Sequence, residues 1–419
     1  MKGIFVKMIF VLLLTTCFCE SSFAYPFDAY ASTGIRRLER LRLIAEGQLK
    51  GTKPVPGACK SISDIKLNLV NVPDDSLPIF PPPDLILQQK IDALFLNRHE
   101  SYSLALLEIT PGRKNRFAAR QANRSFSPGS VGKLAVAAGL FTELNRLFPT
   151  LPEKRQELLR TRFVIADKWI HSDEHEVPIY NPETGAYVSR AVRDGDEFSL
   201  YEWIDHMLSA SSNSAASIVW KEVMLMHAFG DRYPPSPEEE KGFFENTPKS
   251  ELSDLAIAVV NDPLRAFGIE ENEWRLGSFF TSNGKKIVPG AGGSEASPLG
   301  LLKYLLALER GQIVDRWSSL EIKRLLCMTA RRIRYASSPA LTDAAVYFKS
   351  GSLYRCKPEP DFECKKYMGN VENGMNSVAI VEHPDGRMYL VAIMSNVLKK
   401  NSAVEHQTLA TYIDRLLKE

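Results

Sequence analysis

The sequence lacks a hydrophobic run long enough to span a membrane. The apolar run near its start, residues 8–14, is far shorter than the about 20 residues that a transmembrane helix needs. Two lysines precede this run and Ser22-Phe23-Ala24 follows it, a small-x-small pattern that suits signal peptidase. We therefore expect residues 1–24 to be an export signal that is cleaved near Ala24, giving a periplasmic or secreted protein. Lipid attachment at Cys17 is the less favoured alternative, because lipidation sites prefer Gly, Ala or Ser before the cysteine.

The chain also lacks an excess of charge of either sign. It contains 52 basic and 50 acidic residues, and the 395 residues that follow the expected signal carry a net charge of about +1. We therefore do not expect nucleic acid as a partner. We find neither an internal repeat nor a low-complexity tail, and 395 residues suffice for one large domain or two fused units.

Cysteine is scarce, with six residues in the chain. Four of them follow the expected signal, and an exported protein permits disulfides. Cys356 and Cys364 enclose only seven residues and are the favoured pair. The alternative is that Cys59, Cys327, Cys356 and Cys364 are all unpaired thiols.

Residues 25–83 are predicted to be a separate N-terminal extension. It contains a basic amphipathic stretch at residues 35–49, a possible strand at residues 65–72 and a Pro-rich segment at residues 78–83 that is either a linker or a packed brace. The basic stretch offers the only possible membrane contact, but we favour a charged helix face in solvent.

Residues 84–419 have the pattern of a compact catalytic domain. An early hairpin is followed by many amphipathic or apolar helices, then by three strands and a final helix. This order predicts an α+β fold, in which one antiparallel five-stranded sheet is flanked by helices and an all-helical insert occupies about residues 130–340. The strands are predicted at residues 103–109, 116–121, 344–348, 377–381 and 388–394.

Helix signals divide the insert. Ser199 and Glu202 form a capping box before an amphipathic helix that leads into Ser211-Ser212-Asn213. Asp84 and Ser297 are predicted caps of two further helices. The histidines at 171 and 175 could be read as metal ligands, but two histidines in a polar loop are more often solvated and zinc needs more partners.

The first chemical motif is Ser130-Val131-Gly132-Lys133. It places a hydroxyl at the start of a buried helix and an amine one turn later on the same face, where a neutral lysine could take the serine proton. A Ser-x-x-Lys pattern is weak alone, and the chain has two others, at Ser63 and at Ser282. Only Ser130 is followed by an apolar helix.

Two further motifs follow in the chain. Ser211-Ser212-Asn213 lies between two predicted helices, where its hydroxyl and amide could relay a proton and hold a substrate amide, although an ordinary helix connection has the same composition. Residues 349–352, Lys-Ser-Gly-Ser, end a predicted strand. A cation, hydroxyls and a glycine there would let an extended substrate lie along the strand edge.

In this order, the three motifs resemble the signatures of the serine β-lactamases and penicillin-binding proteins. The resemblance covers about residues 84–419 and is strongest to the class A β-lactamases and their penicillin-binding relatives. A helix opened by Ser297-Pro298 is similar to the helix that follows the omega loop in that class.

The resemblance implies a role for each motif residue, and it implies neither a cofactor nor a resident metal. The oxyanion hole would be formed by the backbone N–H groups of Ser130 and Ser352. The implied catalytic residues are Ser130 as nucleophile, Lys133 as acylation base, and Ser211 with Lys349 as proton relay to the leaving nitrogen. The implied substrate-binding residues are Asn213 for the side-chain amide, Ser350 and Ser352 for the carboxylate, and Gly351 for close approach.

One part of the class A pattern is missing. The omega-loop glutamate that activates the deacylating water has no counterpart in residues 279–283, Phe-Phe-Thr-Ser-Asn. Glu270, Glu271, Glu273 and Glu295 lie nearby in the chain, but none sits in a recognisable motif, so the deacylation base is unassigned.

Three functions fit these motifs. The leading hypothesis is a β-lactamase-like hydrolase that cleaves β-lactam amide bonds and would give antibiotic resistance. The missing glutamate motivates the alternative, a D-Ala-D-Ala carboxypeptidase or endopeptidase acting on peptidoglycan peptides. The extension motivates a third, a non-hydrolytic module that binds penicillin or muropeptides. The expected partner is thus a small-molecule β-lactam or a peptidoglycan peptide.

Overall fold

The structure is a computed structural model that describes residues 28–72, 80–327 and 331–418. The expected export signal, with Cys17 and Ala24, lies outside these residues, as do the first two residues of the Pro-rich segment. Within the described ranges, no helix combines the length and the apolarity that crossing a bilayer requires.

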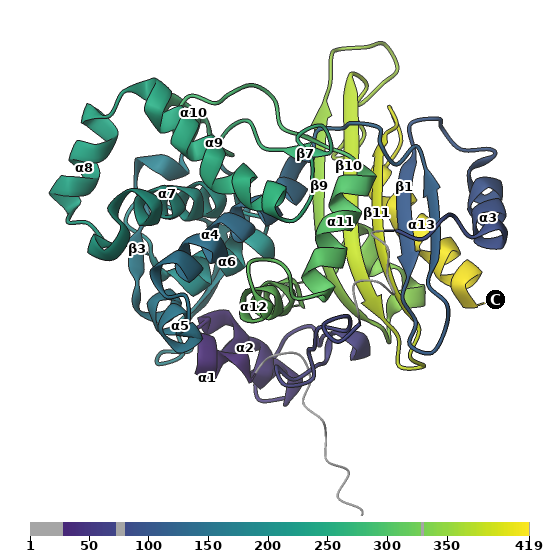
Figure 1. The fold of residues 1–419 in the computed structure, drawn as a ribbon, viewed down its shortest axis with the longest axis horizontal. Helices are drawn as coiled ribbons and strands as arrows, with labels where there is room; N and C mark the ends of the chain where they lie inside the picture. The colour runs from purple at the N-terminus through teal and green to yellow at the C-terminus, as the bar shows by residue number, and fades with distance from the viewer. Residues whose placement is uncertain (1–27, 73–79, 328–330, 419) are drawn as a thin grey trace, which may run out of the picture.

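A five-stranded antiparallel sheet organises one half of the molecule (Figure 1). The early hairpin pairs with the C-terminal strands, which confirms the predicted α+β fold and its five-stranded antiparallel sheet. The order across the sheet is β2 (Arg116–Arg120), β1 (Ser103–Glu108), β11 (Met388–Asn396), β10 (Glu372–Glu382) and β9 (Ala345–Arg355).

Both faces of the sheet are apolar and covered, because successive side chains of a strand point to opposite faces. One face packs against α3 (Leu85–Phe95) and α13 (Ser402–Lys418) in a smaller core. The other face belongs to the main core, together with α11 (Pro298–Glu309) and α12 (Arg316–Cys327). Figure 1 shows α11 crossing the sheet on the side that faces the helical half.

The segment between β2 and β9 builds the helical half of the molecule. At its centre lies α4 (Lys133–Leu147), whose residues from Lys133 to Phe141 are all buried, as the apolar pattern predicts. The other helices here are α5 (Pro152–Thr161), α6 (Leu200–Leu208), α7 (Asn213–Phe229), α8 (Pro237–Asn246), α9 (Lys249–Ala266) and α10 (Ser282–Ile287). Short strand pairs join β3 (Phe163–Ile165) to β6 (Glu197–Ser199), β4 (Glu176–Tyr180) to β5 (Tyr187–Ala191), and β7 (Trp274–Arg275) to β8 (Glu295–Ala296).

Three predicted helix caps are confirmed. Ser199 and Glu202 form a reciprocal capping box at the start of α6, which satisfies N–H groups that the first turn cannot bond internally. Asp84 caps α3 and Ser297 caps α11 through their side-chain oxygens. The helix that leads to residue 211 is therefore fixed locally at its start.

The first helices of the N-terminal extension pack against the helical half. Its helices are α1 (Ala29–Thr33) and α2 (Arg36–Ala45), and apolar residues of both lie in the main core. The Arg37 guanidinium donates two hydrogen bonds, of 2.5 and 2.6 Å, to the Asp205 carboxylate near the end of α6, and both side chains are buried. The expectation that the charged face of this helix lies in solvent is therefore wrong for Arg37, because α6 presents a buried carboxylate to it.

The strand expected at residues 65–72 is absent. The backbone N–H groups of Asn68 and Leu69 donate instead to the side-chain and main-chain oxygens of Glu309, at the end of α11. The segment therefore satisfies its backbone by capping a helix, which a local pattern of β-branched residues does not reveal.

Candidate active site

Ser130 and Lys133 lie where the chain enters α4. Ser130 is in the short 3-10 turn η3 (Gly129–Gly132) and remains partly exposed, whereas Lys133 begins α4 and has no exposed surface. One turn separates the two residues, so the Lys133 Nζ atom lies 3.0 Å from the Ser130 Oγ atom. The amine is placed to exchange a proton with the hydroxyl.

Burial changes the acidity of Lys133. Loss of hydration disfavours the ammonium form and lowers the pKa of Lys133 to about 7, against the opposing attraction of the Asp173 carboxylate. A neutral amine is therefore well populated near neutral pH. The Nζ atom also lies 5.1 Å from the centre of the Phe280 ring.

The connection between α6 and α7 provides the acceptors for Lys133. Its Nζ atom donates to the Ser211 carbonyl oxygen at 2.5 Å and to the Asn213 Oδ1 atom at 2.8 Å, and it lies 3.5 Å from the Ser211 Oγ atom. Ser211 has a φ of +62°, in the left-handed region that costs a non-glycine residue energy. Such strain at a polar junction is typical of functional sites.

β9 brings a second lysine to the same hydroxyl. The Lys349 Nζ atom donates to the Ser211 Oγ atom at 2.8 Å and to the Ser350 carbonyl oxygen at 3.0 Å. Burial lowers the pKa of Lys349 well below its ordinary value, and the nearby charges of Lys133 and Arg334 lower it further. One hydroxyl thus lies between two lysines of weakened basicity.

Gly351 lets β9 approach the nucleophile. A Cβ atom at this position would lie 2.8 Å from the Ser130 backbone nitrogen and 2.4 Å from the Pro128 carbonyl oxygen. On the other side of this contact, a Cβ atom at Gly129 would lie 3.2 Å from the Ser352 backbone nitrogen. The backbones of Ser130 and Ser352 are therefore neighbours, as the two donors of an oxyanion hole must be.

Arg334 joins the site although no sequence pattern marks it. It lies in the 3-10 turn η6 (Arg334–Ser337) with a φ of +54°, and its Nη2 atom donates to the Ser352 Oγ atom at 3.0 Å. Its guanidinium carbon lies 4.8 Å from the centre of the Tyr367 ring. It follows a run of arginines with no helical or strand period, and only the tertiary fold singles it out.

A second residue that the sequence missed is Asp173, in the loop between β3 and β4. Its side chain is 2% exposed and contacts residues next to Ser211. The same loop carries the histidines at 171 and 175, which could be read as metal ligands. In the described parts of the chain, however, no three His, Cys, Asp or Glu side chains cluster in a way suited to a metal ion. An aspartate between histidines in a polar insertion carries no signal of burial.

The segment 279–283 forms a wall beside Lys133. Phe279 stacks on Trp220 with ring centres 4.4 Å apart, Thr281 caps α10, and Phe280 lies near the Lys133 amine. This wall contains no carboxylate. The glutamates considered for the missing base are exposed or paired elsewhere, as Glu273 is with Lys303.

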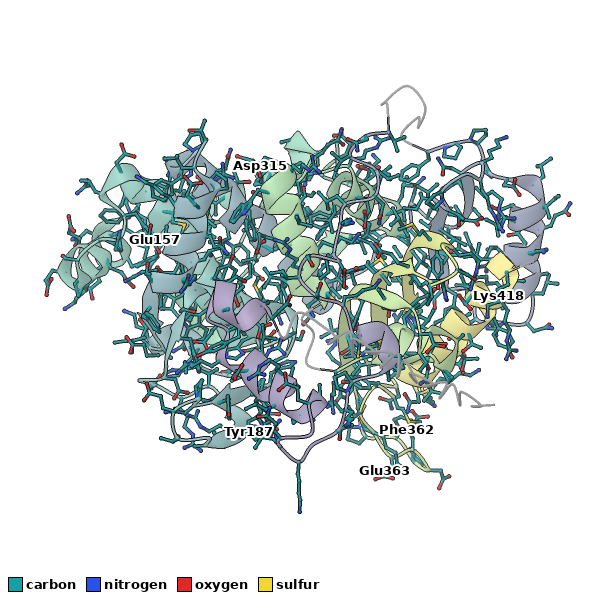
Figure 2. The ribbon with its side chains drawn as sticks, turned by 90° about the horizontal axis from the view of Figure 1, so that it is seen from below. Glu157, Tyr187, Asp315, Phe362, Glu363 and Lys418 are labelled. Atoms are coloured by element: carbon teal, nitrogen blue, oxygen red, sulfur yellow. A yellow bond between two sulfur atoms is a disulfide. The ribbon has the colours of Figure 1, made fainter. Side chains whose placement is uncertain are left out.

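The structure joins Cys356 to Cys364 by a disulfide, with Cα atoms 6.1 Å apart, and leaves Cys59 and Cys327 as free thiols. The bridge closes part of the loop that follows β9. Figure 2 shows two residues of this loop, Phe362 and Glu363, at its protruding tip.

Comparison with known proteins supports the fold. No protein-family model matches the sequence, and no curated protein sequence matches it. Among solved structures, a class A β-lactamase from Bacteroides cellulosilyticus DSM 14838 aligns with a TM-score of 0.51 at 15% identity, covering 80% of this chain and 97% of that one. The TLA-1 extended-spectrum β-lactamase aligns with a TM-score of 0.50 at 12% identity, covering 80% and 98%. The penicillin-binding protein PBP-A aligns with a TM-score of 0.48 at 15% identity, covering 80% and 97%.

Proposed function

We propose, on the premise that this chain has the fold of the serine β-lactamases and penicillin-binding proteins, that it forms an acyl-enzyme at Ser130. The observation that carries the proposal is the hydrogen-bonded series Ser130, Lys133, Ser211 and Lys349, drawn from η3, α4, the loop before α7 and β9. The substrates would be β-lactams or acyl-D-Ala-D-Ala peptides. Such substrates lie outside the cytoplasm, where the export signal expected in residues 1–24 would send the protein.

The acylation step follows from this geometry. Neutral Lys133 takes the proton of the Ser130 hydroxyl as its Oγ atom attacks the substrate carbonyl carbon. The backbone N–H groups of Ser130 and Ser352 stabilise the oxyanion of the tetrahedral intermediate. As the C–N bond breaks, the Ser211 hydroxyl passes its proton to the leaving nitrogen and takes up the proton that Lys133 received from Ser130, with Lys349 beside it.

Positive charge in the site favours a substrate with a carboxylate. Lys349 lies near both Arg334 and Lys133, and loss of hydration disfavours the charged form of all three side chains. A substrate carboxylate bound by Ser350, Ser352 and Arg334 would offset that cost. Asn213 would hold the amide of the acyl side chain, and Gly351 would admit the substrate along the β9 edge.

The fate of the acyl-enzyme separates the candidate functions. Hydrolysis of a β-lactam adduct needs a base that activates water, and the segment 279–283 beside Lys133 offers the Phe280 ring instead of a carboxylate. Phe280 therefore favours a serine D-Ala-D-Ala carboxypeptidase or endopeptidase over a fast β-lactamase. A non-hydrolytic receptor would keep its adduct indefinitely.

An intact-mass time course with a penicillin tests the proposal. We expect one adduct per chain, absent from Ser130→Ala and unchanged in Ser63→Ala, which removes the serine of another Ser-x-x-Lys match. Slow loss of the adduct together with release of D-alanine from a peptidoglycan peptide would support the peptidase. Rapid turnover of penicillin would instead establish a β-lactamase, and the absence of any adduct would refute acyl-enzyme formation at Ser130.

A further inference from the structure

The insertion between β3 and β4 places a buried carboxylate behind the Ser211-Ser212-Asn213 connection. The Asp173 Oδ2 atom accepts hydrogen bonds from the Ser212 Oγ atom and from the Ser214 backbone nitrogen, each at 2.8 Å. The Oδ1 atom lies 2.6 Å from the His175 Nδ1 atom. Both carboxylate oxygens are thus engaged, one of them entirely by the segment that carries Ser211 and Asn213.

Asp173 determines how α7 begins. Ser212 is the N-cap of α7, and its Oγ atom accepts a hydrogen bond from the Ala215 backbone nitrogen at 3.1 Å. Because the hydroxyl gives its proton to Asp173, its lone pair is left facing Ala215. A carboxylate at a helix N-terminus is also favoured by the helix dipole. The first turn of α7 is therefore fixed by a residue almost 40 positions earlier in the chain.

That first turn supplies the surroundings of Lys133. Three of the four hydrogen-bond acceptors of its amine are the Ser211 carbonyl oxygen, the Ser211 hydroxyl and the Asn213 amide oxygen. The positive φ of Ser211 persists only if contacts on both sides hold it. On the α6 side the Ser212 backbone nitrogen donates to the His206 carbonyl oxygen. On the α7 side the Ser212 hydroxyl donates to the Asp173 carboxylate.

The insertion is itself held in place beside the site. The Ser214 hydroxyl donates to the Ile170 carbonyl oxygen at 2.8 Å, and the Thr281 hydroxyl donates to the Trp169 carbonyl oxygen at 2.7 Å. The insertion therefore contacts both the Ser211 connection and the Phe280 wall. Because the insertion is held at these points, the Asp173 carboxylate is itself fixed and can hold the Ser211 connection in position.

We propose that Asp173 is a positioning residue, which sets the geometry of Ser211 and Lys133 for attack by Ser130. This role rests on the proposed acyl-enzyme function. Asp173 acts through hydrogen bonds to the Ser211 connection and through its negative charge, and it does not touch the substrate. The charged groups that face Lys133 and its neighbours are Asp173 from the insertion, Lys349 from β9 and Arg334 from η6, while His175 faces Asp173.

The test measures the second-order rate constant for labelling by a fluorescent penicillin as a function of pH. Asp173→Ala removes both hydrogen bonds, and we expect labelling to slow on the order of 100-fold, the cost of a misplaced catalytic group. Asp173→Asn keeps one acceptor oxygen but loses the charge. We expect it to label about tenfold more slowly, and its rate profile to shift to lower pH, because loss of the anion lowers the pKa of Lys133.

Asp194→Ala is the matched control. Asp194 lies in the loop between β5 and β6, is exposed, and contacts the His171 ring of the insertion through its carboxylate. We expect it to label at the wild-type rate. A thermal melt of each variant tests whether it is folded. If Asp173→Ala does not fold, the labelling rate and pH profile of Asp173→Asn alone test the positioning role.

The outcomes separate this inference from the proposed function. Wild-type protein that takes no label refutes the function and the positioning role together. Labelled wild type beside an Asp173→Asn variant with the same rate and the same pH midpoint refutes the positioning role alone. A slower rate with a midpoint shifted to lower pH supports it, since a loss of stability alone would not move the midpoint in that direction.

Discussion

The two walls that enclose Lys133 differ in chemistry. On one side, which we call the polar wall, the Ser211 connection surrounds its amine with hydroxyl, amide and carbonyl groups at 2.5 to 3.5 Å, and β9 adds the Lys349 amine at 2.8 Å from the Ser211 hydroxyl. On the other side, the 279–283 segment presents the Phe280 ring. For the acylation that we propose at Ser130, the polar wall provides the groups that would move the proton, whereas the aromatic wall provides no carboxylate that could serve as a base for water. Formation and hydrolysis of an acyl-enzyme are therefore separate structural problems within one site.

Removal of the amine at the centre of the polar wall should have the largest effect. In Lys133→Met the serine loses its base, and we expect penicillin labelling to slow on the order of 1,000-fold. Stopped-flow or gel-based labelling measures this rate. Lys285→Met, from another Ser-x-x-Lys match, should label normally, and a normal rate in Lys133→Met would show that another group takes the proton.

The polar wall also depends on support from the N-terminal extension. Arg37→Ala leaves the Asp205 carboxylate buried without its arginine near the end of α6, and we expect unfolding to become easier by about 3–5 kcal/mol. Urea denaturation followed by fluorescence measures the change. Arg40→Ala is the control, because that arginine stacks on the Tyr187 ring, which Figure 2 shows beside the N-terminal helices. Loss of this contact should lower the free energy of unfolding by only about 0.5–1 kcal/mol.

A carboxylate on the aromatic wall should make the two walls more alike. Phe280→Glu would place a base near Lys133, and we expect the penicillin adduct to be lost on the order of 10-fold to 100-fold faster. Intact-mass decay measures the rate. Phe280→Gln has the same size without the charge and should keep the slow decay. Equal decay in both variants would mean that the absence of a carboxylate does not limit hydrolysis.

The pH dependence of labelling examines the polar wall alone. The base that we propose for Ser130 is neutral Lys133, whose pKa burial lowers to about 7. Labelling should therefore reach a plateau above neutral pH and fall about tenfold for each pH unit below it, because the ammonium form cannot accept the proton. A rate that is constant across this range would be inconsistent with Lys133 as the base.

The sequence predicts the elements of the polar wall better than their extents. The strand predicted to end before Lys349 continues to Arg355, because β10 pairs with it along its whole length and holds polar residues of low strand propensity in the sheet. Ser130 stands out because an apolar helix follows it, and the cap at Ser199 fixes the helix that leads to Ser211. These signals are local, and local patterns are what a single sequence displays.

The residues that sequence reasoning missed act over long separations. Asp173 contacts Ser212 and Ser214 about 40 positions away, and Arg334 contacts Ser352 from an irregular turn. Neither residue lies in a segment with helical or strand periodicity, and neither is next to a recognisable motif. The sequence pattern likewise places Arg37 on a solvated helix face, because its partner Asp205 is 168 residues away.

Pairing of β1 with β11 has a consequence for how the protein folds. Ser103 lies opposite Met394, so the sheet cannot close until almost the whole chain has been made. Contacts between such distant segments form slowly, because a long loop must first be closed. Ser130 therefore meets Lys349 only when β9 to β11 have joined the sheet. The proposed nucleophile lies in an incomplete site until then, and we expect acylation only in the folded protein.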